Sequence, residues 1–107
     1  MADDLPRFGL DASTLARIKA VLAGFPDIKV ALLYGSRAKG NFRPGSDIDL
    51  TLKGSRLTEA KLLAVERALD DLDLPYKMDV SLYAALDNPE LLAHIARVGV
   101  ALKSTQR

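Results

Sequence analysis

Residues 33–50 read LYGSRAKGNFRPGSDIDL, and this stretch carries the clearest structural signal in the chain. An apolar, β-branched run at residues 28–34 leads into it, and an alternating apolar and polar segment at residues 47–53 completes it; both patterns predict strands. Residues 35–45 are rich in glycine, basic and amide side chains, which predicts a loop with at most a short helical turn. The chain is therefore expected to leave a buried strand and enter a second strand that has one apolar and one polar face.

The polar faces of the predicted strands carry aspartates. Asp47 and Asp49 are two positions apart on one strand, which places their Cα atoms about 7 Å apart on the same face. Asp79 occupies the polar face of a third predicted strand, residues 76–83, and would complete the set. Crowded carboxylates repel one another unless protons or cations neutralise them, and hard oxygen ligands favour Mg²⁺ or Mn²⁺. We therefore predict a site for two divalent ions on Asp47, Asp49 and Asp79, and treat Asp70, Asp71 and Asp73 as a solvated turn.

A phosphate-binding turn is predicted beside this site. Gly35 lets the backbone approach an anion closely, and Ser36 adds a hydroxyl donor. Arg37 and Lys39 are predicted to bind the same phosphate-bearing ligand, because they could neutralise its charge. Simple solvation is the alternative for these loop cations and for Arg43. Lys53 continues the acidic strand's polar face and is expected near the site.

Helical spacing of apolar residues predicts the rest of the fold. A helix over residues 12–23 follows the N-cap Asp11, a second helix follows Thr58 and ends before Pro75, and a third opens at Asn88. Gly99 stops the third helix before a short edge strand at residues 100–102, and residues 5–10 and 104–107 are expected to be loose ends. His94, at the edge of the last helix's apolar stripe, is expected to have a partly buried structural role rather than to bind a ligand.

Composition bounds the functional classes. The chain has 107 residues, 49% of them hydrophobic, no Cys, and a formal net charge of +1. This predicts one small soluble domain with a structured core of about residues 10–103, without disulfides, sulfur-bound zinc or the basic field typical of duplex DNA binding. The longest apolar run, residues 30–34, is far shorter than the about 18 residues of a membrane span. The acidic N-terminus is unlike that of a signal peptide, so we expect a cytoplasmic protein without direct nucleic-acid or membrane partners.

These motifs together resemble those of a known family. Gly35-Ser36, a spacer, Asp47-Ile48-Asp49 and a later strand aspartate, Asp79, are similar to the signature of the DNA polymerase beta-like nucleotidyltransferase superfamily. The sequence Gly-Ser-Arg-Ala-Lys-Gly followed by Ser-Asp-Ile-Asp-Leu most resembles the motif of its minimal nucleotidyltransferase branch, the MNT antitoxins paired with HEPN toxins. The likeness is specific over residues 33–50, and the order of elements extends it over most of the chain. One departure is Lys39, where many relatives carry Arg. Lysine keeps the positive charge but cannot make the paired hydrogen bonds of a guanidinium group.

The resemblance implies an α+β (α/β) nucleotidyltransferase fold, a small mixed β-sheet with helices packed on one side. It implies Mg²⁺-dependent transfer of AMP from ATP, with Asp47 and Asp49 holding the metals and the triphosphate. Asp79 would bind the catalytic metal and help deprotonate the attacking hydroxyl, and Gly35 and Ser36 would hold the β- and γ-phosphates. The implied acceptor is a tyrosine of a HEPN toxin, which adenylylation silences in a type VII-like toxin-antitoxin pair.

Two alternatives stay open at this point. A binding-only antitoxin would mask the toxin by contact without catalysis. A nucleotidyltransferase with a small-molecule acceptor, such as an aminoglycoside, is the other; the short chain argues against it, because larger relatives carry an added domain for the acceptor or the base. We therefore expect the acceptor surface to come from another chain, in a hetero-oligomer.

Overall fold

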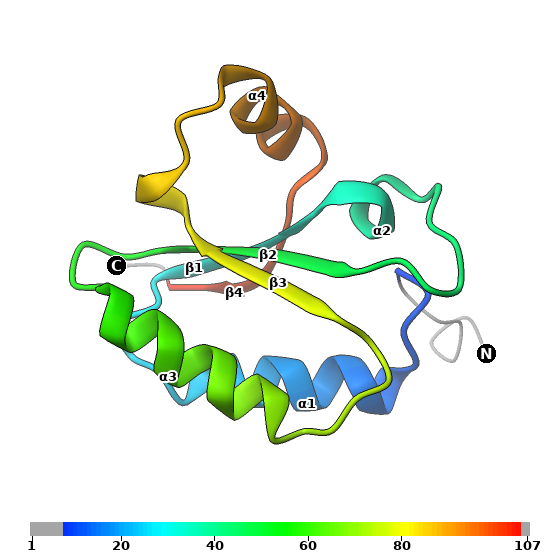
Figure 1. Cartoon of the computed structure of the whole chain (residues 1–107), viewed down its shortest axis with the longest axis horizontal. Coiled ribbons are helices and arrows are strands. Elements are labelled where there is room, and N and C mark those ends of the chain that lie inside the picture. The colour runs from blue at the N-terminus through cyan, green and yellow to red at the C-terminus, as the bar shows by residue number, and fades with distance from the viewer. Residues whose placement is uncertain (1–7, 106–107) are drawn as a thin grey trace.

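A four-stranded mixed sheet forms the centre of the computed structural model, which describes residues 8–105. Its strands are β1 (Val30–Tyr34), β2 (Ile48–Lys53), β3 (Met78–Leu82) and β4 (Val100–Ser104), in the spatial order β3-β2-β1-β4 (Figure 1). β1 pairs antiparallel with both β2 and β4, whereas β2 and β3 run parallel. The sheet is therefore mixed, as the family resemblance implies, and β4 lies at an edge, as the sequence predicts.

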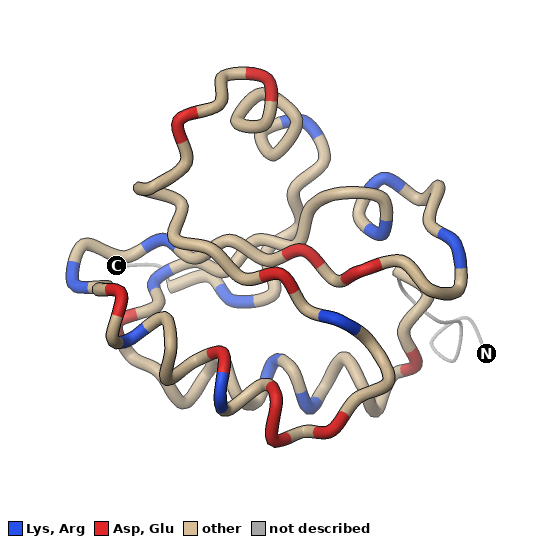
Figure 2. Tube along the Cα trace, viewed as in Figure 1, with Lys and Arg blue, Asp and Glu red and all other residues tan. Residues whose placement is uncertain are grey.

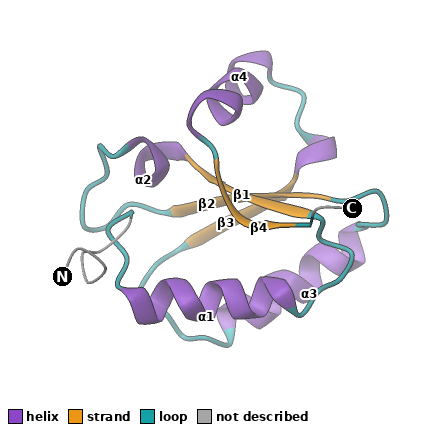
Figure 3. Ribbon diagram, turned by 180° about the vertical axis from the view of Figure 1, so that it is seen from behind, coloured by secondary structure: helices purple, strands orange, loops and turns teal. Residues whose placement is uncertain are grey.

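Helices lie on both faces of this sheet. The two longest, α1 (Ala12–Ala23) and α3 (Glu59–Asp70), run side by side across one face, and the expected packing of helices on one side holds for this pair (Figures 1 and 3). The short helix α2 (Gly35–Lys39) and the last helix, α4 (Pro89–Val98), lie over the opposite face (Figure 3). A single 3₁₀ turn, η2 (Tyr83–Ala85), follows β3. The face under α2 and α4 is the one that carries the polar side chains of β2 and β3.

Each long helix begins where the sequence places its cap. The Asp11 carboxylate accepts a hydrogen bond of 2.7 Å from the Thr14 N–H, and the Thr58 hydroxyl accepts one of 3.2 Å from the Lys61 N–H. Asn88 accepts from the backbone N–H groups of the first turn of α4. These side chains satisfy N–H groups that have no partner inside the helix, which is why the helices start there.

The hydrophobic core lies between the sheet and the α1 and α3 helices. Alternate residues of β2 point into it, which leaves Asp49, Thr51 and Lys53 on the other face. Each fully buried Leu or Ile side chain contributes about 1.5–3 kcal/mol relative to an exposed one. The members that are completely inaccessible to solvent are Ile18, Leu22, Ile28, Ala31, Leu33, Ile48, Leu50 and Val65.

The structure corrects several predicted boundaries. The first strand begins at Val30 rather than at residue 28, and the second begins at Ile48, so Asp47 precedes its strand. The expected loose end at residues 5–10 is wrong at Leu10, which is only 1% exposed because it packs in the core. Ser104 is also no loose end, because it pairs with Val30 as the last residue of β4. Residues 5–7 and 106–107 lie outside the described residues.

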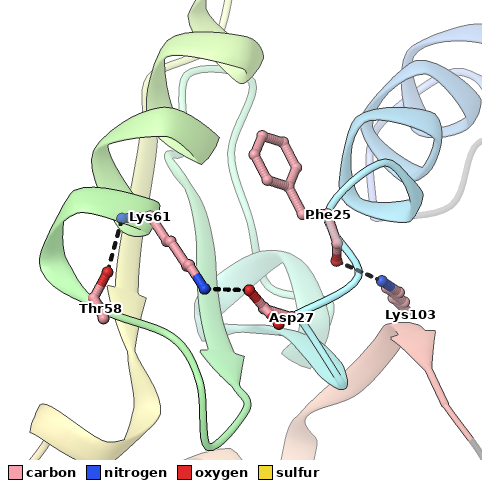
Figure 4. Close-up of polar contacts among 5 residues, drawn as sticks. All are labelled: Phe25, Asp27, Thr58, Lys61 and Lys103. Atoms are coloured by element: carbon pink, nitrogen blue, oxygen red, sulfur yellow. Dashed lines mark hydrogen bonds and ion pairs between the residues drawn. The ribbon is translucent and has the colours of Figure 1, made fainter.

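Polar contacts tie the elements together at the end of the sheet where β1 begins. Lys61 of α3 pairs with Asp27 in the turn before β1, and Lys103 of β4 donates to the carbonyl oxygen of Phe25 over 2.8 Å (Figure 4). Gly54, directly after β2, packs so closely that a Cβ would lie 2.1 Å from the Asp27 carbonyl oxygen. Within residues 8–105, no helix is long and apolar enough to cross a membrane.

Candidate functional site

Asp49 and Asp79 are direct neighbours on the polar face of the sheet. β2 and β3 pair in parallel with Asp49 opposite Asp79, and β1 places Tyr34 opposite Asp49 on the other side. Laterally paired residues of adjacent strands present their side chains on the same face. Figure 2 shows the acidic positions of the two strands side by side in the middle of the molecule. Asp49 is half-buried and Asp79 is exposed, while Asp47 is exposed just before β2.

Like charges gather around Asp49. Burial raises the pKa of its carboxyl group, and the neighbouring carboxylates of Asp79 and Asp47 raise it further. Within residues 8–105 the ion pair formed is that of Lys61 with Asp27, at the far end of the sheet. The ionised Asp49 is therefore held in an environment that favours a proton or a cation beside it.

Gly35 lies against the Asp49 carboxylate where β1 turns into α2. Its φ is +78°, in the left-handed region, and a Cβ at this position would lie 2.3 Å from Asp49 Oδ2. Only glycine satisfies both requirements without displacing the aspartate. Ser36, the next residue, is half-buried at the same turn. The structure thus brings Gly35 against Asp49, and Ser36 follows in the same turn.

His94 joins this turn from α4. The Gly35 N–H donates a hydrogen bond of 3.0 Å to His94 Nε2, across 59 positions of sequence. The imidazole also meets the Tyr34 ring edge to face, with ring centroids 6.3 Å apart. The sequence correctly indicates a partly buried role for His94 but does not show that it lies at the site, because no local pattern links α4 to the end of β1.

Hydroxyl groups line the sheet beside the aspartates. Ser81 Oγ donates to Thr51 Oγ1 over 3.1 Å, next to the Asp49–Asp79 pair. Burial raises the pKa of the Tyr34 phenol; a hydrogen bond with Ser81 opposes the rise, and Asp49 and Asp79 add to it. The phenol therefore stays protonated at neutral pH.

Arg37 is placed differently from a typical phosphate ligand. Its side chain is only 2% exposed, with Nε donating to the Ser46 carbonyl over 3.0 Å and Nη1 to the Phe8 carbonyl over 2.7 Å. The guanidinium also lies 5.4 Å from the ring centroid of Phe42 and 4.9 Å from that of Tyr76. These contacts anchor the segment between α2 and β2, and the nucleotide-binding role of Arg37 stays a prediction.

The other predicted cations are more accessible. Lys39 is exposed at the end of α2, and Arg43 is exposed in the loop, where its N–H donates to Ser46 Oγ over 2.9 Å. Lys53 lies on the polar face of β2, but its Nζ is 4.3 Å from the Tyr83 ring centroid. Of these three, Lys39 is the closest to Gly35 and Ser36 along the chain.

The donor set suits a hard divalent cation in its chemistry. Carboxylate oxygens are the ligands that Mg²⁺ or Mn²⁺ prefers, and here they come from the adjacent strands β2 and β3. Burial and the neighbouring carboxylates raise the pKa of Asp49, so a cation beside it would be stabilising. In the described part of the chain, no three His, Cys, Asp or Glu side chains are already gathered into a metal-binding group. The side chains of Asp47, Asp49 and Asp79 would therefore have to turn toward one another to share an ion.

Solved structures share this fold. A chain of the crystal structure of a toxin-antitoxin with AMP-PNP matches with a TM-score of 0.67 and 21% identity, covering 86% of this chain and 74% of that chain. A chain of the tri-AMPylated Shewanella oneidensis HEPN toxin in complex with MNT antitoxin matches with a TM-score of 0.62 and 18% identity, covering 88% and 72%. Identities this low show a common fold.

The sequence itself matches one family model. The model described as Polymerase beta, Nucleotidyltransferase covers residues 16–107, and no curated protein matches the chain. The match includes the Gly35-Ser36 turn and all three aspartates of the candidate site, and it confirms the superfamily resemblance. The chain belongs to the polymerase beta nucleotidyltransferase family.

Proposed function

We propose that this protein is an antitoxin that transfers AMP from ATP to a tyrosine hydroxyl of a HEPN toxin. The observation that carries the proposal is the pairing of Asp49 with Asp79 beside the Gly35-Ser36 turn. Family membership supports nucleotidyl transfer. Two neighbours in fold support the rest, since one is a toxin-antitoxin with AMP-PNP and the other contains a tri-AMPylated HEPN toxin with its MNT antitoxin.

The proposed reaction is a single displacement at phosphorus. The acceptor hydroxyl oxygen forms a bond to the α-phosphorus of ATP, the bond between the α-phosphorus and the α,β-bridging oxygen breaks, and pyrophosphate leaves with the bonding electrons. The hydroxyl proton passes to the Asp79 carboxylate, which is exposed and so can be reached by an acceptor on another chain. Asp49, half-buried between Tyr34 and Asp79, is better placed on the nucleotide side.

In this proposal Asp47, Asp49 and Asp79 would hold Mg²⁺. When bound, Mg²⁺ neutralises these carboxylates and stabilises charge on the entering and leaving oxygens. Gly35 lets the turn pack closely against Asp49, which brings the turn to the triphosphate, and the Ser36 hydroxyl donates a hydrogen bond to that triphosphate. Lys39 supplies an exposed positive charge for the terminal phosphates. Arg37 contributes by holding the segment between α2 and β2 through its backbone contacts.

The direct test is transfer of label from α-³²P-labelled ATP to the co-purified HEPN partner in the presence of Mg²⁺. Asp79→Asn should reduce transfer by at least about 100-fold, because the metal would lose a ligand and the attacking hydroxyl would lose its proton acceptor. Asp71→Asn, on an exposed carboxylate at the end of α3, is the matched control and should transfer normally. An unlabelled partner after treatment with the wild-type protein would end the proposal.

Toxin neutralisation in cells separates catalysis from masking. The double variant Asp47→Asn with Asp49→Asn should lose protection if AMP transfer silences the toxin. Full protection by this variant would assign the effect to contact alone.

A further inference from the structure

We infer that His94 is a positioning residue of this site, which fixes the Gly35 peptide and, through it, the place of the Asp49 carboxylate. Its effect on turnover rests on the proposed function, but its effect on Gly35 and Asp49 does not. His94 lies on α4, whereas the turn that it holds joins β1 to α2. The last helix would thus set the geometry of a site whose aspartates lie at β2 and β3.

His94 supplies an acceptor that the turn itself lacks. The first N–H groups of a helix have no carbonyl partner within it, and a side chain of the preceding residue usually accepts from one of them. Here the preceding residue is Tyr34, and its side chain makes no capping hydrogen bond. The imidazole of His94 replaces that cap for the Gly35 N–H at 3.0 Å.

The bond defines the state and the orientation of the imidazole. Because Nε2 accepts a hydrogen bond, it must carry the lone pair, and Nδ1 must carry the hydrogen of the neutral ring. The ring is half-buried, and its near-perpendicular contact with Tyr34, at an interplanar angle of 78°, limits its rotation. A fixed ring is what allows a side chain from a distant helix to hold a backbone group in place.

Movement of Gly35 would be transmitted to Asp49. The place where a Cβ of Gly35 would lie is 2.3 Å from Oδ2 and 3.2 Å from Cγ of Asp49, so the glycine backbone and the carboxylate are packed together. Loss of the His94 bond frees the peptide to rotate, and the carboxylate then loses the surface that limits its rotamers. His94 therefore acts on the site through Gly35 rather than by touching substrate.

The test compares two amides that differ in reach. In His94→Gln the side-chain oxygen can occupy the place of Nε2, whereas in His94→Asn it reaches only as far as Nδ1; His94→Phe keeps the ring but has no acceptor. We expect hydrogen exchange of the Gly35 amide, followed by NMR on the whole chain, to accelerate about 10-fold in the Phe and Asn variants and to return toward wild type in Gln. Long-range ¹H–¹⁵N spectra of the wild type should show Nδ1 protonated and Nε2 bare.

Transfer activity should follow the same order, with kcat about 10-fold lower in His94→Phe and His94→Asn and largely recovered in His94→Gln. Arg97→Gln, on an exposed residue of the same helix, controls for changes in α4 itself. An unchanged Gly35 amide in His94→Phe, or equal behaviour of Gln and Asn, would overturn the inference. Absence of any transfer by the wild type would overturn the proposed function instead, and the Gly35 measurement would still decide the role of His94.

Discussion

The two ends of the β1–β2 pair place a carboxylate in opposite electrostatic environments. At the end where β1 begins, Asp27 pairs with Lys61, and Lys103 caps backbone carbonyls nearby (Figure 4). At the end where β1 finishes, Asp49 lies beside Asp79 and Asp47. The hydrogen bond with Lys61 lowers the pKa of Asp27, whereas burial and the neighbouring carboxylates raise that of Asp49.

The paired Asp27 contributes to stability, whereas Asp49 lies in the candidate functional site at the other end of the same two strands. A paired carboxylate favours the folded state, while a repelled, half-buried one opposes it. A protein retains the second arrangement where an incoming cation or proton restores the balance, and such groups gather at functional sites. The Asp27 end therefore serves as the internal reference for every measurement on the Asp49 end.

The largest expected contrast is in activity. Asp49→Asn should reduce AMP transfer by at least about 100-fold, because the proposed metal site would lose its central ligand. The same substitution should raise stability by about 1 kcal/mol, roughly 4–8 °C in melting temperature for a domain of this size, because an unfavourable charge is removed. Asp27→Asn should transfer AMP at the wild-type rate and melt at a lower temperature. Equal loss of activity in both variants would abolish the distinction between the two ends.

Two glycines test the packing of the site. Gly35→Ala and Gly40→Ala both place a Cβ at positive φ, which destabilises each by about 1–2 kcal/mol. Only the Gly35 variant also drives a methyl group into Asp49, since nothing lies within 4 Å of the Gly40 position. We expect transfer to fall about 10-fold further in Gly35→Ala than in Gly40→Ala. Identical kinetics would show that the contact with Asp49 has no catalytic importance.

The pH dependence of stability should have opposite signs at the two ends. The raised pKa of Asp49 means that the folded state binds more protons than the unfolded state above the ordinary value of 3.8, so this group's contribution is lost as pH rises through its folded pKa. The lowered pKa of Asp27 means that its contribution is present above 3.8 and is lost as pH falls through its folded pKa.

Melting temperatures measured from pH 3 to pH 7 check both signs. The gain in Asp49→Asn over wild type should grow as pH rises, and the deficit in Asp27→Asn should appear over the same interval. A gain for Asp49→Asn that is constant with pH would mean that its charge is not the cause.

The smallest effect is expected from the exposed ion pair. Lys61→Gln should lower the melting temperature slightly and reduce the pH dependence that Asp27 contributes, because accessible ion pairs are screened by water and salt. AMP transfer should not change. A loss of transfer in Lys61→Gln would show that the two ends are coupled through the sheet.

Local patterns were sufficient to predict most of the fold. The capping residues Asp11, Thr58 and Asn88 gave the starts of the long helices, and strict alternation placed Asp49 and Asp79 on polar strand faces. Boundaries at strand ends were less accurate, since Asp47 could not be told from a strand residue by alternation alone. Leu10 was misplaced because only tertiary packing buries it.

The aspartates of the candidate site could be predicted from the sequence, but the residues that hold the site in place could not. The aspartates and the Gly35-Ser36 turn follow from short-range spacing, but the bond from Gly35 to His94 joins residues 59 positions apart. Arg37 illustrates the same limit. Its sequence position suits a phosphate ligand, whereas its side chain donates to the carbonyl oxygens of Phe8 and Ser46, which only the folded path of the chain brings near it. Contacts between elements that are distant in sequence leave no periodic signal.

Binding of Mn²⁺, detected by electron paramagnetic resonance with a non-hydrolysable ATP analogue present, decides whether Asp49 and Asp79 hold a divalent cation. We expect nucleotide-dependent Mn²⁺ binding by the wild type and by Asp27→Asn, and at least about 10-fold weaker binding by Asp49→Asn and by Asp79→Asn. Undiminished binding by both of the latter variants would contradict it, because the paired aspartates of β2 and β3 would then not be the metal ligands.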